Sequence, residues 1–288
     1  MGKVGICDIN KKEGGRMSQT IDEVNSIVPV SIEWMYRHIE HAVSKWDSFC
    51  TIKEKEKEVF SWPHFETDFA DPGYKRKNEV DGYDEKEYFH FIPAFQTFLN
   101  MNGLSDKNIH PIASEFFSAG CRVQDDLVQF LTSRHQSPFR LSDDIDLNCR
   151  IRKEIVFSKH LITLRFLKYL PKVHGEEISK PHVDKSGLSI ALYCSHGGLQ
   201  YAHLLDHSGE LVEWRDVEIT KESGVVFPSH QMLSFSGRKI KPLAHRVIQA
   251  KMNEPRYSVV LFIPFLSERR FPKHLRTQDM MEELGYKL

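Results

Sequence analysis

Three potential metal ligands lie in the second half of the sequence. His182 and Asp184 are separated by one residue, and His245 follows 63 positions after His182. Because side chains alternate along an extended strand, a His-x-Asp pair places both side chains on one face, where a distant histidine can complete a triangular site. Two neutral nitrogens and one anionic oxygen suit Fe(II), and they leave positions open for a co-substrate and dioxygen. The three residues therefore predict a mononuclear iron site.

A second polar pair, Arg256 and Ser258, follows the last of these ligands after a short interval. The two side chains share one strand face, and the apolar run 259–262 that continues the strand predicts that it is buried. Burying a guanidinium group is costly without an anionic partner, and its fork of donors suits a carboxylate. The pair therefore predicts a site for one end of a small dicarboxylate whose other end reaches the metal.

These segments resemble, in order and in spacing, the Fe(II)/2-oxoglutarate dioxygenases of the isopenicillin N synthase-like family. The strong motifs are the run 182–190, Gly197-Gly198-Leu199-Gln200, His245-Arg246-Val247 and the run 256–262. Lys86 to Phe91 and Leu164-Arg165 to Pro171 resemble the family more weakly. The resemblance covers roughly residues 25 to 268, with its strong motifs after about residue 160.

The resemblance implies an α+β fold: a double-stranded β-helix, or jelly-roll, core with a mostly helical N-terminal half packed on it. It implies that His182, Asp184 and His245 hold Fe(II), and that Arg256 and Ser258 hold the distal carboxylate of 2-oxoglutarate. It also implies that dioxygen is the second co-substrate. The implied reaction hydroxylates a small molecule and releases succinate and CO2.

Tyr169 is a further candidate for binding the co-substrate. Many family members carry Asn-Tyr-Tyr-Pro where this chain has Leu167-Lys168-Tyr169-Leu170-Pro171, so only one tyrosine is present. A shift of one residue would turn the ring to the other face of the strand, and a role in core packing stays open.

Two other functions are compatible with the same motifs. Relatives that oxidise their substrate without 2-oxoglutarate can retain Arg-x-Ser, so a related Fe(II) oxidase stays an alternative. A non-catalytic binding or sensing homologue is the other. Dependence of oxygen uptake on 2-oxoglutarate separates the first alternative from the dioxygenase, and loss of iron binding would favour the second.

The hydrophobic pattern supports the implied order of elements. Apolar residues at helical spacing predict a helix from Ser31, its N-cap, to Trp46, and a second helix over 111–131. Short β-rich runs at 160–170, 187–194, 223–227 and 257–265 predict an antiparallel sheet. We therefore expect a helical region over 1–155, the jelly-roll catalytic core over 156–268 and a helical tail over 269–288. Residues 63–84 are expected to form a long loop, and residues 1–24 a loose leader.

Several residues with chemical potential are more simply structural. The alternating run 53–58 is expected to be a solvated face whose neighbouring charges cancel, and Gly197-Gly198 a tight turn between strands. Surface or loop positions are expected for four of the 15 histidines: His196, His203, His207 and His230.

Composition restricts the partners. The chain of 288 residues has a formal net charge of −1, so it offers no overall basic footprint for nucleic acid or an anionic membrane. No run of about 18 apolar residues suggests a membrane span. Five widely spaced cysteines without a C-x-x-C pair indicate a reducing cytoplasm. We expect a cytoplasmic enzyme that acts on a small molecule, as a monomer by resemblance to the family.

Overall fold

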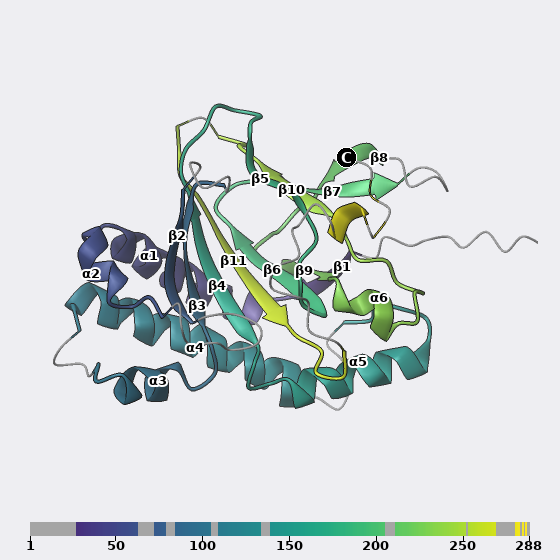
Figure 1. Cartoon of the computed structure of the whole chain (residues 1–288), viewed down its shortest axis with the longest axis horizontal. Helices are drawn as coiled ribbons and strands as arrows, with labels where there is room; N and C mark the ends of the chain where they lie inside the picture. The colour runs from purple at the N-terminus through teal and green to yellow at the C-terminus, as the bar shows by residue number, and fades with distance from the viewer. Residues whose placement is uncertain are drawn as a thin grey trace, which may run out of the picture.

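The computed structural model describes residues 27–62, 72–78, 84–104, 109–133, 139–204, 211–251, 253–268, 280–282, 284 and 286. Its centre is a pair of antiparallel sheets (Figure 1). The larger sheet has the order β1 (Val28–Ser31), β9 (Ser223–Pro228), β6 (Leu188–Cys194), β11 (Arg256–Ile263), β4 (Thr163–Tyr169), β3 (Lys86–Phe91) and β2 (Gly73–Lys77). The smaller sheet has the order β5 (Glu177–His182), β10 (His245–Ile248), β7 (Leu199–Leu204) and β8 (Leu211–Asp216).

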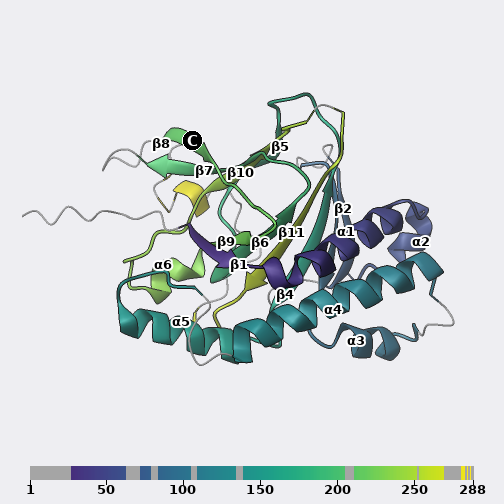
Figure 2. The same cartoon turned by 180° about the vertical axis from the view of Figure 1, so that it is seen from behind.

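Helices cover the outer face of the larger sheet. Figures 1 and 2 show α1 and α4 side by side on this face, with α5 continuing the layer. The helical elements are η1 (Glu33–Met35), α1 (Tyr36–Cys50), α2 (Glu54–Glu58), α3 (Phe95–Met101), α4 (Pro111–Ser133), α5 (Ile145–Phe157) and α6 (Gln231–Phe235).

Side chains of β4 alternate between the helical layer on one face of the larger sheet and the smaller sheet on the other. Leu164 and Phe166 are buried against the helices, and the Phe166 ring meets the edge of Phe116 from α4 at a centroid distance of 5.4 Å. Leu167 and Tyr169 point the other way and pack in a cluster with residues of the smaller sheet. The inner face of β4 is therefore a wall of the space between the sheets.

This arrangement confirms the predicted jelly-roll core with helices packed on it. The predicted β-rich runs correspond to β4, β6, β9 and β11, and the two predicted helices to α1 and α4. Ser31 was wrongly predicted as a helix cap: it ends β1, which pairs with β9, and the helical turn after it has Ile32 as N-cap without a side-chain bond. The region predicted as a loop over 63–84 contains β2, which pairs with β3. The division of the chain at residue 155 stays a prediction, and β1, β2 and β3 from before that point lie in the same sheet as the later strands.

The charged run 53–58 was also wrongly predicted to be wholly solvated. Lys57 in α2 is 3% exposed, and its Nζ lies 2.5 Å from Oε2 of Glu87 on β3. The Tyr74 hydroxyl donates to the same carboxylate at 2.9 Å. This buried group of charges fastens α2 to the edge of the larger sheet.

The predicted leader over 1–24 lies outside the described residues, and so does most of the predicted C-terminal helix. Of that tail, residues 280–282, 284 and 286 are described, and Met280, Met281, Leu284 and Tyr286 pack against Val183 and Ala244 next to the smaller sheet. Within the parts of the chain that the structure describes, no helix has both the length and the apolar character needed to cross a bilayer.

Candidate metal and co-substrate site

All six residues singled out from the sequence lie around one pocket between the two sheets. His182, Asp184 and His245 come from the smaller sheet and the turn after β5, whereas Tyr169, Arg256 and Ser258 come from the larger sheet. The rest of the wall is mostly apolar. The structure therefore brings the two predicted groups together on opposite walls of the same space.

The two histidines lie directly opposite each other on β5 and β10. His182 and His245 are register partners, and their ring centroids are 4.3 Å apart. Nδ1 of His182 lies 2.7 Å from the Lys180 carbonyl oxygen, and Nδ1 of His245 lies 3.2 Å from that of Leu243. Because a carbonyl oxygen only accepts, each Nδ1 carries the proton, which leaves both Nε2 lone pairs available to a cation.

Asp184 completes the set. Its Oδ1 is 3.8 Å from Nε2 of His182, and its Oδ2 is 3.7 Å from Nε2 of His245. One potential ligand atom from each residue lies within 4.8 Å of the other two. The Ser189 hydroxyl donates to Oδ2 at 2.6 Å and orients the carboxylate. Two imidazoles and one carboxylate converging in this way are a donor set suited to Fe(II).

The protonation states of His182 and Asp184 favour the binding of a cation. Burial, helped by the neighbouring His245, lowers the pKa of His182 to about 4. Burial alone would raise the pKa of Asp184, but the two imidazoles and the Ser189 hydroxyl outweigh it and lower that pKa. At neutral pH His182 is therefore neutral and Asp184 is ionised, the state in which both residues bind a metal.

Arg256 is buried at the opposite wall, with an exposed fraction of 2%. Its Nε donates to the Gly197 carbonyl at 3.1 Å, and its Nη1 donates to the Ser258 hydroxyl at 2.9 Å. Burial lowers the pKa of this guanidinium group. None of the ion pairs among the described residues includes Arg256. A buried cation held by neutral groups alone is suited to a bound anion.

The predicted Gly197-Gly198 turn lies between β6 and β7 and supplies the carbonyl that holds Arg256. Gly198 has φ +101°, and a Cβ atom there would lie 2.2 Å from the Ile248 carbonyl oxygen. Both the backbone conformation and the close approach require glycine. The turn thus has a role in the site that the sequence did not reveal.

Tyr169 faces the pocket, directly opposite Arg256 in the strand register. The Arg256 guanidinium carbon lies 5.9 Å from the centroid of its ring. The structure settles which face the ring occupies, while a co-substrate role for its hydroxyl stays a prediction. Of the four histidines expected at the surface or in loops, His196, His203 and His230 are half-buried and His207 lies outside the described residues.

Sequence reasoning missed Arg165 and His90, which lie on the inner face of the larger sheet. Arg165 shares the inward row of β4 with Tyr169, four residues away, and lines the pocket. The Arg165 Nε donates to Nε2 of His90 at 2.6 Å. The even spacing from Tyr169 was a usable signal, because residues at even spacing share a strand face.

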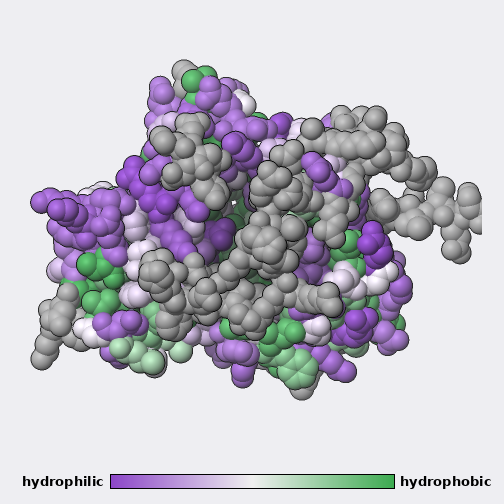
Figure 3. Space-filling view, in the orientation of Figure 1, coloured by the Kyte–Doolittle hydropathy of each residue, from purple (hydrophilic) through white to green (hydrophobic). Residues whose placement is uncertain are grey.

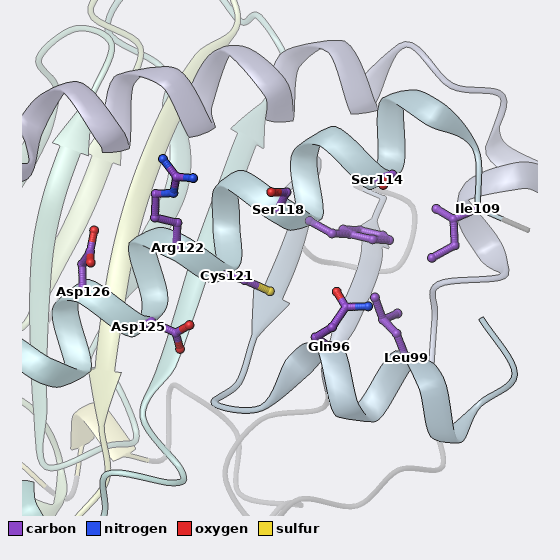
Figure 4. A pocket seen from close by; sticks show the side chains of 10 residues that line it. Gln96, Leu99, Ile109, Ser114, Ser118, Cys121, Arg122, Asp125 and Asp126 are labelled. Carbon is purple, nitrogen blue, oxygen red and sulfur yellow. The ribbon is translucent and has the colours of Figure 1, made fainter. Parts of the chain in front are cut away.

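A second cavity lies among the helices, away from the predicted ligands. Figure 4 shows it between α3 and α4, with Arg122 and Asp125 among its polar residues.

Figure 3 shows a mostly hydrophilic surface over the upper and left part of one face, with small hydrophobic patches along the lower edge. The pocket between the sheets is therefore the candidate site, since it holds the convergent donor set.

A comparison with protein-family models matches the segment that contains the pocket residues. Residues 159–264 match the model of the 2OG-Fe(II) oxygenase superfamily, a segment that contains all six predicted site residues. No curated protein sequence matches the chain.

Three similar solved structures share the fold at low sequence identity. A full-length Neurospora crassa protein, in complex with alpha-KG and thymine, has a TM-score of 0.59 and 14% identity, over 91% of this chain and 88% of that one. AtDAO1 of Arabidopsis thaliana, a dioxygenase for auxin oxidation bound to 2-oxoglutarate, has a TM-score of 0.55 and 15% identity, over 86% and 87%. JOX2, in complex with 2OG, Fe and JA, has a TM-score of 0.56 and 16% identity, over 91% and 76%.

Proposed function

We propose that the chain is an iron- and 2-oxoglutarate-dependent dioxygenase and that His182, Asp184 and His245 hold its Fe(II) ion. The segment that matches the 2OG-Fe(II) oxygenase superfamily, residues 159–264, contains all three side chains. The observation that carries this assignment is the convergence of two Nε2 atoms and one carboxylate within 4.8 Å. The ion, when bound, supplies the redox chemistry that couples decarboxylation of 2-oxoglutarate to oxidation of a substrate by dioxygen. The protein orients the reactants and limits the access of water.

Arg256 and Ser258 bind the distal carboxylate of 2-oxoglutarate in this proposal. Arg256 is buried without an ionic partner among the described residues, and a carboxylate would offset the cost of burying its charge. The Gly197 carbonyl and the Ser258 hydroxyl fix the direction of the guanidinium fork. Tyr169, opposite on β4, contributes its ring to the wall and its hydroxyl to the co-substrate.

In this proposal the substrate is a small organic molecule, and the enzyme hydroxylates it. The pocket wall beyond the two polar groups is lined by Leu167, Phe227 and Val260, which suit an apolar molecular body. The similar structures are described with thymine for the Neurospora crassa protein, auxin oxidation for AtDAO1 and JA for JOX2, and these support a small-molecule substrate. A cytoplasmic location is also proposed, supported by four free cysteines in the described chain. The proposal of a monomer rests on the resemblance to the family.

Anaerobic titration of the Fe(II)-loaded protein with 2-oxoglutarate tests the assignment, because chelation of the iron gives a visible charge-transfer band. We expect the band in the wild type and none in Asp184→Ala, which removes the anionic ligand. Asp216→Ala is the matched control, since Asp216 is an exposed carboxylate on β8 of the same sheet. A full band in Asp184→Ala would refute the ligand set, and oxygen uptake without 2-oxoglutarate would identify the oxidase alternative.

A further inference from the structure

Arg165 is a second guanidinium group in the pocket, and the proposed binding of iron and 2-oxoglutarate leaves it without a role. It lies on β4 between His90 of β3 and Val260 of β11, its partners in the strand register. It lines the same pocket as the three proposed iron ligands. A half-buried positive charge therefore lies beside the proposed iron site.

Three side chains fix the direction of Arg165. Its Nε donates to Nε2 of His90 at 2.6 Å, and His90 is itself buried. The guanidinium carbon lies 4.4 Å from the ring centroid of Phe262 and 5.2 Å from that of Tyr88. Cation–π contacts of this kind hold the plane of the group without neutralising its charge.

Arg165 has no ion-pair partner in the described chain, although its charge contributes to the lowered pKa of Asp184. No carboxylate forms an ion pair with it there, and its one side-chain hydrogen bond engages Nε. The two Nη groups are therefore the part of the fork available to a ligand. A fork with two parallel donors matches the two oxygens of a carboxylate.

The register separates Arg165 from the proposed co-substrate anchor. Arg256 faces Tyr169 and Val260 faces Arg165, so the two cations are four residues apart along the strands. At about 3.4 Å for each residue, this places their Cα atoms on the order of 13 Å apart along the sheet. One 2-oxoglutarate molecule that reaches from Arg256 to the metal leaves Arg165 to a different ligand.

We propose that Arg165 binds a carboxylate of the primary substrate and so selects substrates that carry one beside an apolar body. This inference rests on the proposed function of the same pocket. The surroundings favour a monoanion, because Leu167, Val260 and Phe262 provide apolar contacts and a phosphate dianion would need further cations. The substrate class is thus a small, largely apolar carboxylic acid.

The test uses the anaerobic protein with Fe(II) and 2-oxoglutarate bound, and follows the shift of the charge-transfer band as a probe binds beside the iron. The probes are phenylacetate, 3-phenylpropanoate and octanoate, each paired with its neutral methyl ester. The variants are Arg165→Met, which removes the charge, and Arg165→Lys, which keeps it without the fork. Arg150→Met is the matched control, because Arg150 also lies over a phenyl ring, that of Phe235, but outside the pocket.

In the wild type we expect at least one acid to bind about tenfold or more tightly than its ester. Arg165→Met should weaken that acid by about 10- to 100-fold and leave the ester within about threefold, with Arg165→Lys in between. Acid binding that is unchanged in both variants, esters that match their acids in the wild type, or no response to any acid would overturn the proposal. Absence of the band before any probe is added would instead remove the proposed function, and this inference with it.

Discussion

Replacing Arg256 by Met should change the stability of the ligand-free protein little but should greatly reduce its stabilisation by 2-oxoglutarate. The substitution removes a buried charge that has no ionic partner among the described residues, which by itself is neutral or stabilising. It also leaves the Gly197 carbonyl and the Ser258 hydroxyl without their donor, at about 1–3 kcal/mol for each group that stays unsatisfied. The two effects oppose each other, so we expect the ligand-free stability to change by no more than about 2 kcal/mol.

The response to the co-substrate should change much more. At a concentration 100 times the dissociation constant, 2-oxoglutarate stabilises the wild type by about 2.7 kcal/mol. Truncating one side of a buried charge pair costs about 2–5 kcal/mol, and a loss of about 2.8 kcal/mol weakens binding about 100-fold. At the same concentration the variant then gains only about 0.4 kcal/mol.

Thermal unfolding with and without 2-oxoglutarate measures both quantities, with Mn(II) in place of Fe(II) so that the complex survives in air. Arg150→Met serves as the control for loss of an arginine outside the pocket. Equal stabilisation of Arg256→Met and wild type by 2-oxoglutarate would refute the assignment of Arg256 as the carboxylate anchor. A large loss of stability in the ligand-free variant would show instead that the guanidinium group is structural.

Three further predictions concern the supports of the site and of the sheet. Lys57→Met should destabilise the protein by about 3–5 kcal/mol, because it leaves the Glu87 carboxylate buried without its cation. In urea unfolding, the double variant Lys57→Met/Glu87→Leu should recover most of the lost free energy of unfolding. Additive losses in the double variant would contradict the pairing. Gly198→Ala should weaken 2-oxoglutarate binding, because the new Cβ would lie 2.2 Å from the Ile248 carbonyl oxygen and would displace the turn that holds Arg256. Gly197→Ala is the control, since a Cβ there meets no atom within 4 Å. Equal 2-oxoglutarate titration curves for the two variants would disprove this role of the turn. Ser189→Ala should weaken Mn(II) binding by about 10- to 100-fold, because it removes the hydrogen bond that orients Asp184, the proposed metal ligand. Unchanged Mn(II) binding in equilibrium dialysis would count against this prediction.

The sequence could predict four of the strands inside the larger sheet, but not β3, whose run is interrupted by the polar residues Glu87 and His90. β4, β6, β9 and β11 lie inside the larger sheet, so their apolar side chains form nearly continuous runs. β5 and β10 were not predicted because they combine few apolar residues with the polar side chains that serve the site. Among the described strands, β8 pairs with β7 alone, at the edge of the smaller sheet, and it has little hydrophobic pattern to detect.

The site was predictable where its residues lie close together in the sequence. Arg256 and Ser258 share a face of β11 through a spacing of two, as predicted. The same spacing predicted Asp184 beside His182, although Asp184 lies just after the end of β5 and not on the strand. Arg165 gains its meaning from His90, 75 positions earlier, and Lys57 from Glu87, 30 positions later. Such pairings are created by the order of strands in the sheet, which local spacing does not encode.

The position of β11 has a consequence for how the chain folds. This strand, the last of the larger sheet to be synthesised, lies at its centre and joins β1, β9 and β6 on one side to β4, β3 and β2 on the other. Until residues 256–263 are in place, β6 and β4 present unpaired edges, which favour aggregation, and such non-local pairing is slow to form. This strand also carries Arg256 and Ser258. A ribosome-bound or truncated chain that lacks it therefore has neither a continuous sheet nor the proposed anchor for 2-oxoglutarate. Completion of the fold and acquisition of the proposed co-substrate site are therefore a single event.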